Sequence, residues 1–369
     1  MATNQAESAG INQSHLNRLR ASGSDVDGWL RRMAFDSGFI DFGIAPAVEA
    51  SGFSDLVRWI DAGYAADMDY FANRRDAYQH PRSVLAGVKS LIAMAYPYPA
   101  ERRSDNVRGH GRVARYTWEG DDYHDVIHRK LKQMKRLIGE AYPAWNVRGC
   151  VDTAPLLERE IAELAGLGWR GKNTLLLNRV HGSYFFLAVL LVDVELPYSD
   201  PHRTSHCGTC TACLDACPTS AFPQPGVLDA NRCISYLTIE NRDSIAPDLM
   251  HAMGDWFFGC DVCQEVCPWN SKRARQSASD STRKTLDLIE LLEADEDWFR
   301  EHFRKTPFWR TRLRGMKRNA AIVLANQGCI EAVPALLALV EDDDTMVSNT
   351  ARWALKQLDN PNAAPTPPT

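Results

Sequence analysis

Most of the cysteines lie between Cys207 and Cys267, and their spacing is the feature of this chain best suited to chemistry. They form two runs, namely Cys207, Cys210, Cys213 and Cys217 before Pro218, and Cys233, Cys260, Cys263 and Cys267 before Pro268. A C-x2-C-x2-C-x3-C-P run is typical of 4Fe–4S ligation, because three close thiolates hold one cubane and the fourth points to another. The spacing therefore predicts two 4Fe–4S clusters.

In two-cluster ferredoxins the fourth cysteine of each run crosses to the other cluster, and this rule assigns the ligands. We expect a first set to hold one cluster, namely Cys207, Cys210, Cys213 and Cys267. We expect a second set to hold the other, namely Cys217, Cys233, Cys260 and Cys263. Zinc and disulfides are the alternatives. Zinc sites usually show paired C-x2-C knuckles, and disulfides are rare in chains without a secretory signal.

Length and composition indicate a globular protein of two or three domains. The chain has 369 residues, of which 45% are hydrophobic and 24% charged, and its net charge is −5. Any RNA contact must therefore come from a local basic patch. The N-terminal residues 1–20 are polar, and the longest apolar run, 184–192, is too short to span a bilayer. We expect a cytoplasmic protein that does not associate with a membrane.

Helix and strand patterns alternate before the cysteines, which favours an α+β fold. Helical periodicity covers 25–59 and 124–141, and strand patterns cover 90–98, 147–151 and 184–196. Thr153 is expected to begin a helix that ends at Leu164. From its position alone, Asp152 is more suited to capping that helix than to serving as a carboxyl at the mouth of a pocket.

After Pro268 the pattern becomes helical, with paired helices that look like a HEAT-type repeat. The expected apolar stripes are Met316, Ala320, Val323 and Leu324, then Ile330, Val333, Leu336, Leu337 and Val340, then Val347, Ala351, Ala354, Leu355 and Leu358. Residues 304–318 contain seven Lys or Arg and no Asp or Glu. A run of one sign is a candidate phosphate contact.

Two cubanes move single electrons but do not bind an organic substrate by themselves. The residues before the clusters should therefore hold a further redox centre. Gly166-x-Gly168-x-x-Gly171 matches a dinucleotide-binding motif by its letters, but a helix rather than a strand precedes it. We expect these glycines to make a tight turn that leaves Lys172 and Asn173 available to a ligand. The residues alone indicate an iron–sulfur oxidoreductase with an unidentified acceptor.

Motifs along nearly the whole chain resemble those of the epoxyqueuosine reductases, a family of tRNA-modifying enzymes. They are ARY at 114–116 and DYH at 122–124, VDTAP at 151–155 and LER at 157–159, GWRGKNTL at 168–175, RCISYLTIE at 232–240, GCDVCQ at 259–264 and RNAA at 318–321. The resemblance implies reduction of the epoxide of epoxyqueuosine, at the wobble position of tRNA, to queuosine. It also implies a base-off cobalamin that the two clusters reduce to a cob(I) nucleophile.

The resemblance also implies roles for single residues. Asp152 matches the family's proton donor, and a raised pKa would suit it beside a large, mostly apolar corrin. The remaining expected cofactor contacts are Arg75, Lys172, Asn173, Ser235 and Asp261. The expected tRNA contacts are Arg310, Arg312, Arg314, Lys317 and Arg318.

The resemblance further implies two partners, a tRNA anticodon stem-loop with a queuosine-type wobble base and an external low-potential electron donor. We expect a monomer. Two other functions stay open, a cobalamin-dependent enzyme like the reductive dehalogenases and an iron–sulfur electron-transfer protein. The expected layout is a disordered tail (1–22), an α/β cobalamin-binding catalytic domain (23–198), a ferredoxin-type two-cluster domain (199–285), a HEAT-like tRNA-binding domain (286–361) and a second tail (362–369).

Overall fold

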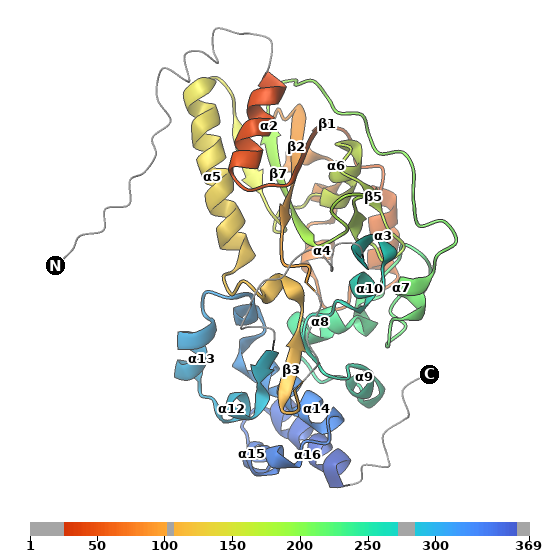
Figure 1. Ribbon diagram of the computed structural model, residues 1–369, viewed down its shortest axis with the longest axis vertical. Coiled ribbons are helices and arrows are strands. Elements are labelled where there is room, and N and C mark those ends of the chain that lie inside the picture. Colours follow the sequence, from red (N-terminus) through yellow and green to blue (C-terminus); the bar gives the residue numbers. More distant parts are fainter. Residues whose placement is uncertain (1–25, 102–106, 272–284, 360–369) are drawn as a thin grey trace, which may run out of the picture.

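The computed structural model describes residues 26–101, 107–271 and 285–359. Both expected tails lie outside these ranges. A sheet domain occupies one end of the molecule and a helical domain the other, with cysteine-bearing segments near their junction (Figure 1). Within the described ranges, no helix is long and apolar enough to cross a membrane.

A four-stranded antiparallel sheet forms the centre of the N-terminal domain, with strand order β1-β2-β7-β4. The strands are β1 (Asp41–Pro46), β2 (Ser90–Pro97), β7 (Phe185–Val192) and β4 (Val147–Cys150). The central strands read SLIAMAYP and FFLAVLLV, and such nearly continuous apolar runs are expected where both faces of a sheet are covered. Their register pairs Ser90 with Val192 and Pro97 with Phe185.

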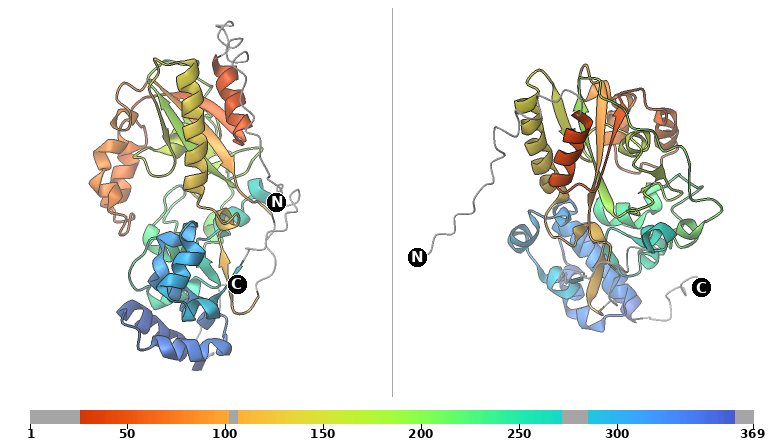
Figure 2. Two further views of the ribbon diagram at one scale, coloured as in Figure 1. Left: turned by 90° about the vertical axis from the view of Figure 1, so that its left-hand side faces the viewer. Right: turned by 45° about the horizontal axis from the view of Figure 1, so that its top comes forward.

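Helices cover both faces of this sheet (Figure 2). On one face, α2 (Val26–Asp36) and α5 (Tyr123–Ala141) bury Leu30, Ile127 and Met134 against the strands. On the other face lies α6 (Glu158–Leu164). The mixture of helices with an antiparallel sheet agrees with the α+β prediction.

The strand β1 was missed, because residues 25–59 were predicted to be helical. The chain forms α2, then β1, then α3 (Phe53–Asp61). Gly43 explains how β1 fits here, since an added Cβ would lie 1.9 Å from the carbonyl oxygen of Ala165. Glycine therefore lets the end of α6 approach the strand closely.

A small second sheet joins distant parts of the chain. β3 (His110–Val113) pairs in parallel with β8 (Trp256–Phe258) and antiparallel with β9 (Thr285–Asp287). A strand from the N-terminal half thus lies between a strand that follows Cys233 and one that begins the C-terminal part.

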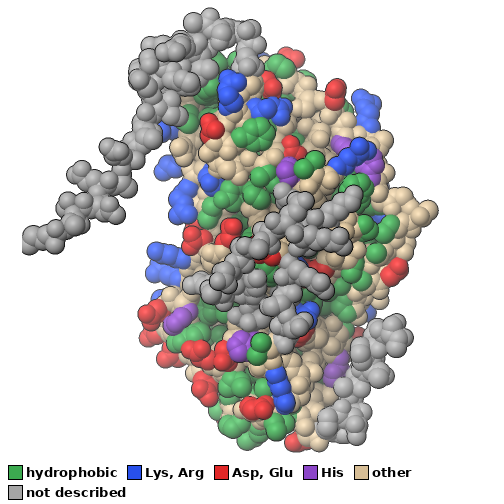
Figure 3. Space-filling view, in the orientation of Figure 1, with side chains coloured by type: hydrophobic (Ala, Val, Ile, Leu, Met, Phe, Trp, Pro, Cys, Tyr) green, Lys and Arg blue, Asp and Glu red, His purple; other side chains and the backbone are tan. Residues whose placement is uncertain are grey.

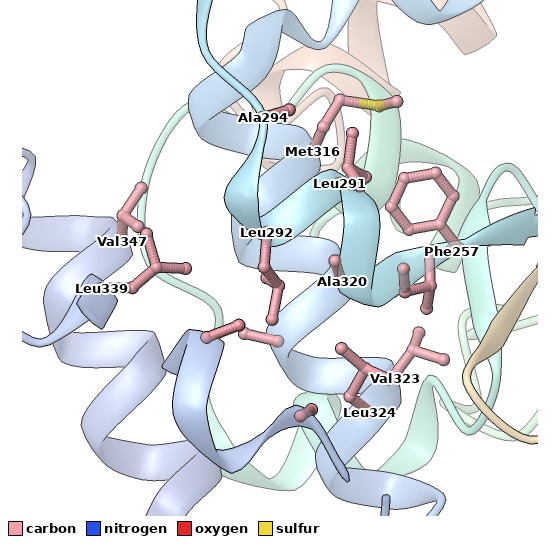
Figure 4. Close-up of a cluster of buried hydrophobic side chains, with 14 of the residues drawn as sticks. Phe257, Leu291, Leu292, Ala294, Met316, Ala320, Val323, Leu324, Leu339 and Val347 are labelled. Carbon is pink, nitrogen blue, oxygen red and sulfur yellow. The ribbon is translucent and has the colours of Figure 1, made fainter. Parts of the chain in front are cut away.

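The C-terminal part is helical. Its elements are α12 (Leu288–Glu293), α13 (Glu296–Phe303), the 3-10 turn η5 (Pro307–Arg310), α14 (Arg312–Asn326), α15 (Val333–Leu339) and α16 (Thr345–Asp359). Figure 4 shows Met316, Ala320, Val323 and Leu324 of α14 in one core with Phe257 of β8. These four are the first predicted stripe.

The second predicted stripe is partly wrong. Leu336 is buried, but Ile330 and Leu337 are 64% and 57% exposed. The reason is that α15 begins only at Val333 and buries one face, so that Leu337, next to Leu336 along the chain, points away from the core.

Candidate functional site

The first cysteine set gathers around Cys213 in α7 (Ala212–Asp215). Burial raises the pKa of the Cys213 thiol, and the nearby thiols of Cys267, Cys207 and Cys210 raise it further. Cys267 precedes α11 (Pro268–Ser271) and comes from the second run. The structure thus brings the crossing cysteine to the predicted set. This set reaches the surface, because Cys210 is exposed.

The four cysteines of the second set are all partly exposed, and none is as exposed as Cys210. Burial raises the pKa of the Cys263 thiol, and the charges of Cys233, Asp261, Cys213 and Cys217 contribute to the rise. Cys213 belongs to the first set, so the two sets are neighbours. Burial also raises the pKa of Cys260 well above its usual value, with Cys263 and Cys233 adding to it. Here too the thiols that come together are those predicted.

Backbone N–H groups act on the sulfurs of this second set. Desolvation raises the pKa of Cys233, and the N–H groups of Tyr236 and Ser235, at the start of α8 (Ile234–Ile239), oppose the rise. The N–H of Ala221 donates to Cys217 Sγ at 3.3 Å. Such hydrogen bonds stabilise a thiolate and a bound cluster.

In the described part of the chain, no three His, Cys, Asp or Glu side chains lie close enough together to hold one metal ion. A cubane distributes its four thiolates over four irons. Its ligands therefore stand farther apart than those of a single tetrahedral ion.

Asp152 does not cap a helix. The predicted helix start at Thr153 is wrong, because α6 begins at Glu158, and Pro155 disfavours helical backbone in the residue before it. The N–H of Thr153 instead donates to the carbonyl oxygen of Val151 at 2.6 Å, which makes a tight turn centred on Asp152. Asp152 has a φ of +56°. This conformation is costly for a non-glycine residue and concentrates at functional sites.

His124 lies between two carboxylates. Its Nδ1 is 2.7 Å from Asp122 Oδ1, and its Nε2 is 3.2 Å from Asp152 Oδ2. Asp122 also caps α5 by accepting the backbone N–H of His124. Tyr123 donates its hydroxyl to Asp152 Oδ2 at 3.0 Å, and its ring stacks on Phe186 of β7 at 4.1 Å. The start of α5 therefore holds both groups against Asp152.

These contacts decide where protons reside. Desolvation lowers the pKa of His124, but hydrogen bonds and charges from Asp122 and Asp152 outweigh it and raise the pKa to about 9. Desolvation raises the pKa of Asp152, but the hydrogen bonds from His124 and Tyr123 and the charge of His124 bring it below its usual value. The expected raised pKa of Asp152 is thus contradicted.

Glu158 can hold a second proton close to Asp152. Burial, followed by the charge of Asp152, raises the pKa of Glu158 to about 8. Glu158 Oε1 accepts the backbone N–H of Asp152 at 2.9 Å. At neutral pH, His124 and Glu158 therefore hold the protons, and Asp152 is ionised.

Asp152 acts on the charge of Arg159, and we call the region around these two side chains the Asp152 recess. The Asp152 side chain is 49% exposed and Arg159 is also exposed, yet desolvation is the largest influence on the pKa of each. The charges acting on Arg159 include Asp152 and Cys263. The recess therefore adjoins the second cysteine set.

Lys172 and Asn173 contact the cysteine loops rather than the recess. Lys172 Nζ donates to the carbonyl oxygens of Gly208 and Cys210, each at 2.8 Å. Asn173 Nδ2 donates to the carbonyl oxygen of Cys263 at 3.2 Å. Two consecutive residues thus hold one loop of each set.

Three further residues were predicted to contact a cofactor, namely Ser235, Asp261 and Arg75, and each lies in different surroundings. Ser235 lies beside Cys233 in the first turn of α8. Asp261 is 2% exposed, and its Oδ2 accepts the backbone N–H of Arg115 at 2.9 Å and the Arg115 guanidinium at 3.0 Å. That buried ion pair fixes Asp261 beside Arg115.

Arg75 forms surface ion pairs with Asp61 and Asp76. Its neighbour Arg74 instead donates to the carbonyl oxygen of Thr153 at 3.2 Å. The structure therefore brings Arg74, rather than the predicted Arg75, to the turn that carries Asp152.

The prediction that Arg318 contacts tRNA is contradicted. The side chain is fully buried and donates to the carbonyl oxygens of Leu237, Asn241 and Asp243 at 2.6, 3.1 and 2.7 Å. It fastens α14 to the chain around α8. A run of charge in the sequence did not reveal that this position faces inward.

Lys317 also stands apart from the arginines. Desolvation lowers its pKa, and the charges acting on it are those of Asp342, Asp295 and Glu296. Acidic side chains gather over α12 and α13, whereas Lys and Arg follow the edge beside α5 (Figure 3).

The other three predicted tRNA contacts come together with a residue that the sequence did not single out. Desolvation lowers the pKa of Arg242, Glu240 opposes this, and the charges of Arg312, Arg310 and Arg314 lower it further. We call these four residues the arginine cluster. Arg310 donates to Glu240 at 2.9 Å and also acts on the charge of Asp152. The cluster therefore begins beside the recess.

The crossed cysteine sets and the adjoining recess define a two-cluster iron–sulfur oxidoreductase. Family models agree: residues 206–270 match a 4Fe-4S double cluster binding domain, and residues 79–153 match "Epoxyqueuosine reductase QueG, DUF1730".

Relatives and solved structures point to the same family. An epoxyqueuosine reductase of Pseudomonas aeruginosa is 40% identical over 329 residues, covering 87% of this chain and 91% of the relative. That of Cyclobacterium marinum is 39% identical over 297 residues, covering 80% and 95%. A crystal structure of epoxyqueuosine reductase with a tRNA-Tyr epoxyqueuosine-modified stem loop aligns with a TM-score of 0.84 at 29% identity, covering 94% of this chain and 92% of that one. This chain belongs to the epoxyqueuosine reductase family.

Proposed function

We propose that this enzyme reduces the epoxide of epoxyqueuosine, at the wobble position of tRNA, to queuosine in the Asp152 recess. Family membership supports the reaction, and a similar protein has been solved with an epoxyqueuosine-modified stem loop. The observation that carries the assignment to this recess is the pair of His124 and Asp152, 3.2 Å apart, beside the second cysteine set.

The cysteine sets suit two 4Fe–4S clusters. Eight thiols in two crossed groups form the expected donor sets, and N–H groups point at the sulfurs of Cys217 and Cys233. We assign the first set to the surface end of the electron path because Cys210 is exposed. The second set then feeds the recess. An external low-potential electron donor would deliver electrons to the first set.

The recess suits a base-off cobalamin. It adjoins the second set, and the aromatic rings of Tyr116 and Tyr123 lie beside it, since Tyr123 bonds to Asp152 and packs edge-to-face on Tyr116. Arg159 and Arg74 offer cationic donors at its edge, and Ser235 lies on the side of the second set. When bound there, cobalamin supplies a low-valent cobalt nucleophile that can attack an epoxide carbon.

The side chains of the recess supply protons. Removing the epoxide oxygen as water and leaving an alkene takes two electrons and two protons. His124 Nε2 can pass one proton to Asp152 Oδ2, which presents it to the alkoxide oxygen, a step typically worth roughly 10²–10⁴-fold in rate. Glu158, with a pKa of about 8, holds a second proton at neutral pH. In this mechanism Asp152 is ionised at rest and receives its proton from His124, whereas the sequence-based expectation was an Asp152 that stays protonated.

The arginine cluster would hold the RNA. Arg242, Arg310, Arg312 and Arg314 form a basic surface that begins beside the recess, as a flipped wobble base requires. A wobble base in a single-stranded loop can be extruded at little cost. We also propose that α14 to α16 act as a HEAT-like tRNA-binding unit, and that the protein works as a monomer in the cytoplasm.

The test is anaerobic turnover of an anticodon stem-loop that bears epoxyqueuosine, followed by mass spectrometry. We expect loss of one oxygen atom, with about eight irons and one cobalamin bound per chain. An iron-replete protein that takes up no cobalamin and leaves the epoxide intact would instead be an electron carrier.

A further inference from the structure

The Trp169 indole is a buried donor without an acceptor among the described residues. The side chain, on β5 (Trp169–Arg170), is 1% exposed, and its Nε1 has no hydrogen-bond partner there. A buried N–H that makes no hydrogen bond is costly, and indole N–H groups usually find a partner when buried. The indole therefore points to an acceptor that the described protein atoms do not provide.

The neighbouring rings do not satisfy it. His206 stands edge-to-face with the indole at 4.7 Å between centroids, but neither of its ring nitrogens accepts the indole N–H. His202 stacks on Trp169 with centroids 5.4 Å apart and an interplanar angle of 26°. The N–H groups of both rings lie in the ring planes, so nearly parallel rings cannot hydrogen-bond to each other. His202 Nε2 is itself buried without a partner in the described ranges.

The first cysteine set lies directly beside the indole. Trp169 packs in one apolar cluster with Cys267, Cys207 and Trp269. Trp269 follows Cys267 and Pro268, and its ring is 5.1 Å from that of Trp169. Both cysteines are ligands predicted for the first cluster. The sulfurs of this set are therefore acceptors that lie within the same apolar cluster as the indole.

The turn that carries Trp169 is also fastened to the same cysteine loop. Gly168 precedes the tryptophan, and a Cβ there would lie 2.0 Å from the carbonyl oxygen of Leu177, so β5 and β6 (Leu176–Leu177) approach closely. On the other side, Lys172 holds the carbonyl oxygens of Gly208 and Cys210. Rigid placement is what a directed N–H···S bond requires.

We propose that the Trp169 indole donates a hydrogen bond to a sulfur of the first cluster and thereby raises the reduction potential of that cluster. An added electron increases the negative charge on the sulfurs, so a donor stabilises the reduced form more than the oxidised form. No covalent bond changes. The effect concerns the first cluster alone, since the second set's N–H donors come from other segments. The inference rests on the proposed function only in requiring that the clusters bind.

The test is an EPR-monitored redox titration of the reconstituted holoenzyme and of Trp169→Phe, which keeps an aromatic ring but removes the N–H. We expect the midpoint of the first cluster to fall and that of the second to stay unchanged. Trp269→Phe is the matched control, because Trp269 touches the same apolar cluster but is partly exposed. We expect it to leave both midpoints nearly unchanged. Equal midpoints in wild type and Trp169→Phe would overturn the proposal.

A second measurement does not depend on how the variant folds. Isotopic labelling of the indole nitrogen in the wild-type holoenzyme should produce a hyperfine coupling to the reduced first cluster by pulsed EPR. The absence of that coupling would also overturn the proposal, since the N–H would then be serving another acceptor. Turnover of the stem-loop is scored separately. A shifted midpoint in an enzyme that leaves the epoxide intact would contradict the proposed function and leave this inference standing.

Discussion

The two cysteine sets share the same chemistry but occupy different surroundings. The first set reaches solvent at Cys210 and is flanked by Trp169 and Lys172. The second contains no exposed cysteine, burial raises the pKa of its Cys260 and Cys263, and it adjoins the Asp152 recess through Arg159. From this difference we propose a direction, with electrons entering at the set that is exposed at Cys210 and leaving from the set beside the recess.

Removing one cluster tests the difference between the two sets most strongly. Cys260→Ser should lose the second cluster, lower the iron content from about eight to about four per chain, and abolish stem-loop turnover. The first cluster should keep its EPR signal, because none of its ligands has changed. Loss of both signals, or of neither, would contradict the division into crossed sets.

At the recess end, Asp152→Asn should lower kcat by roughly 10²–10⁴-fold, because the amide cannot relay a proton from His124. Both cluster signals and the bound cobalamin should remain, which iron, cobalt and EPR analysis would check. Asp193→Asn is a matched control, since Asp193 is another carboxylate of the same domain that contacts Asn146 rather than His124. Wild-type turnover in Asp152→Asn would remove this residue from the mechanism.

Binding of RNA should depend on the recess side and not on the first set. Arg312→Glu with Arg314→Glu should weaken stem-loop binding and reduce the salt slope by about 2, while reduction of the clusters by a protein donor stays unchanged. Arg318 is unsuitable for this test, because its loss would leave buried carbonyl groups unpaired and destabilise the fold. Unaltered binding and salt dependence would show that the arginine cluster does not contact the RNA.

The smallest effect concerns pH. Because the folded pKa of His124 is raised to about 9, the stabilisation from its charged pair with Asp152 is complete below the usual His pKa. It is lost as pH rises through about 9. Turnover should begin to fall near the pKa of Glu158, about 8, and should fall more steeply above about 9, where His124 also loses its proton. In a pH–kcat profile, His124→Gln should keep the limb from Glu158 and lack the steeper limb. A steep limb that persists in this variant would belong to another group.

The sequence predicted the parts that depend on local pattern. The cysteine spacing predicted both sets, and the apolar runs predicted β2, β4 and β7. It could not predict β1, whose six residues carry no clear alternation, or the turn at Asp152, where Pro155 delays the helix. The sequence also could not predict which side chains of a helix face the core. Arg318 lies in a basic run, yet its side chain is fully buried. Arg242 joins its cluster only through tertiary packing, so no local signal marked it.

The most direct test of the electron path uses Cys210→Ser and Cys260→Ser, each assayed for stem-loop turnover with a small chemical reductant and with a protein electron donor. We predict that Cys210→Ser keeps turnover with the small reductant and loses it with the protein donor. Cys260→Ser should fail with both. Turnover by Cys260→Ser with either electron source would contradict the claim that electrons reach the recess through the second set.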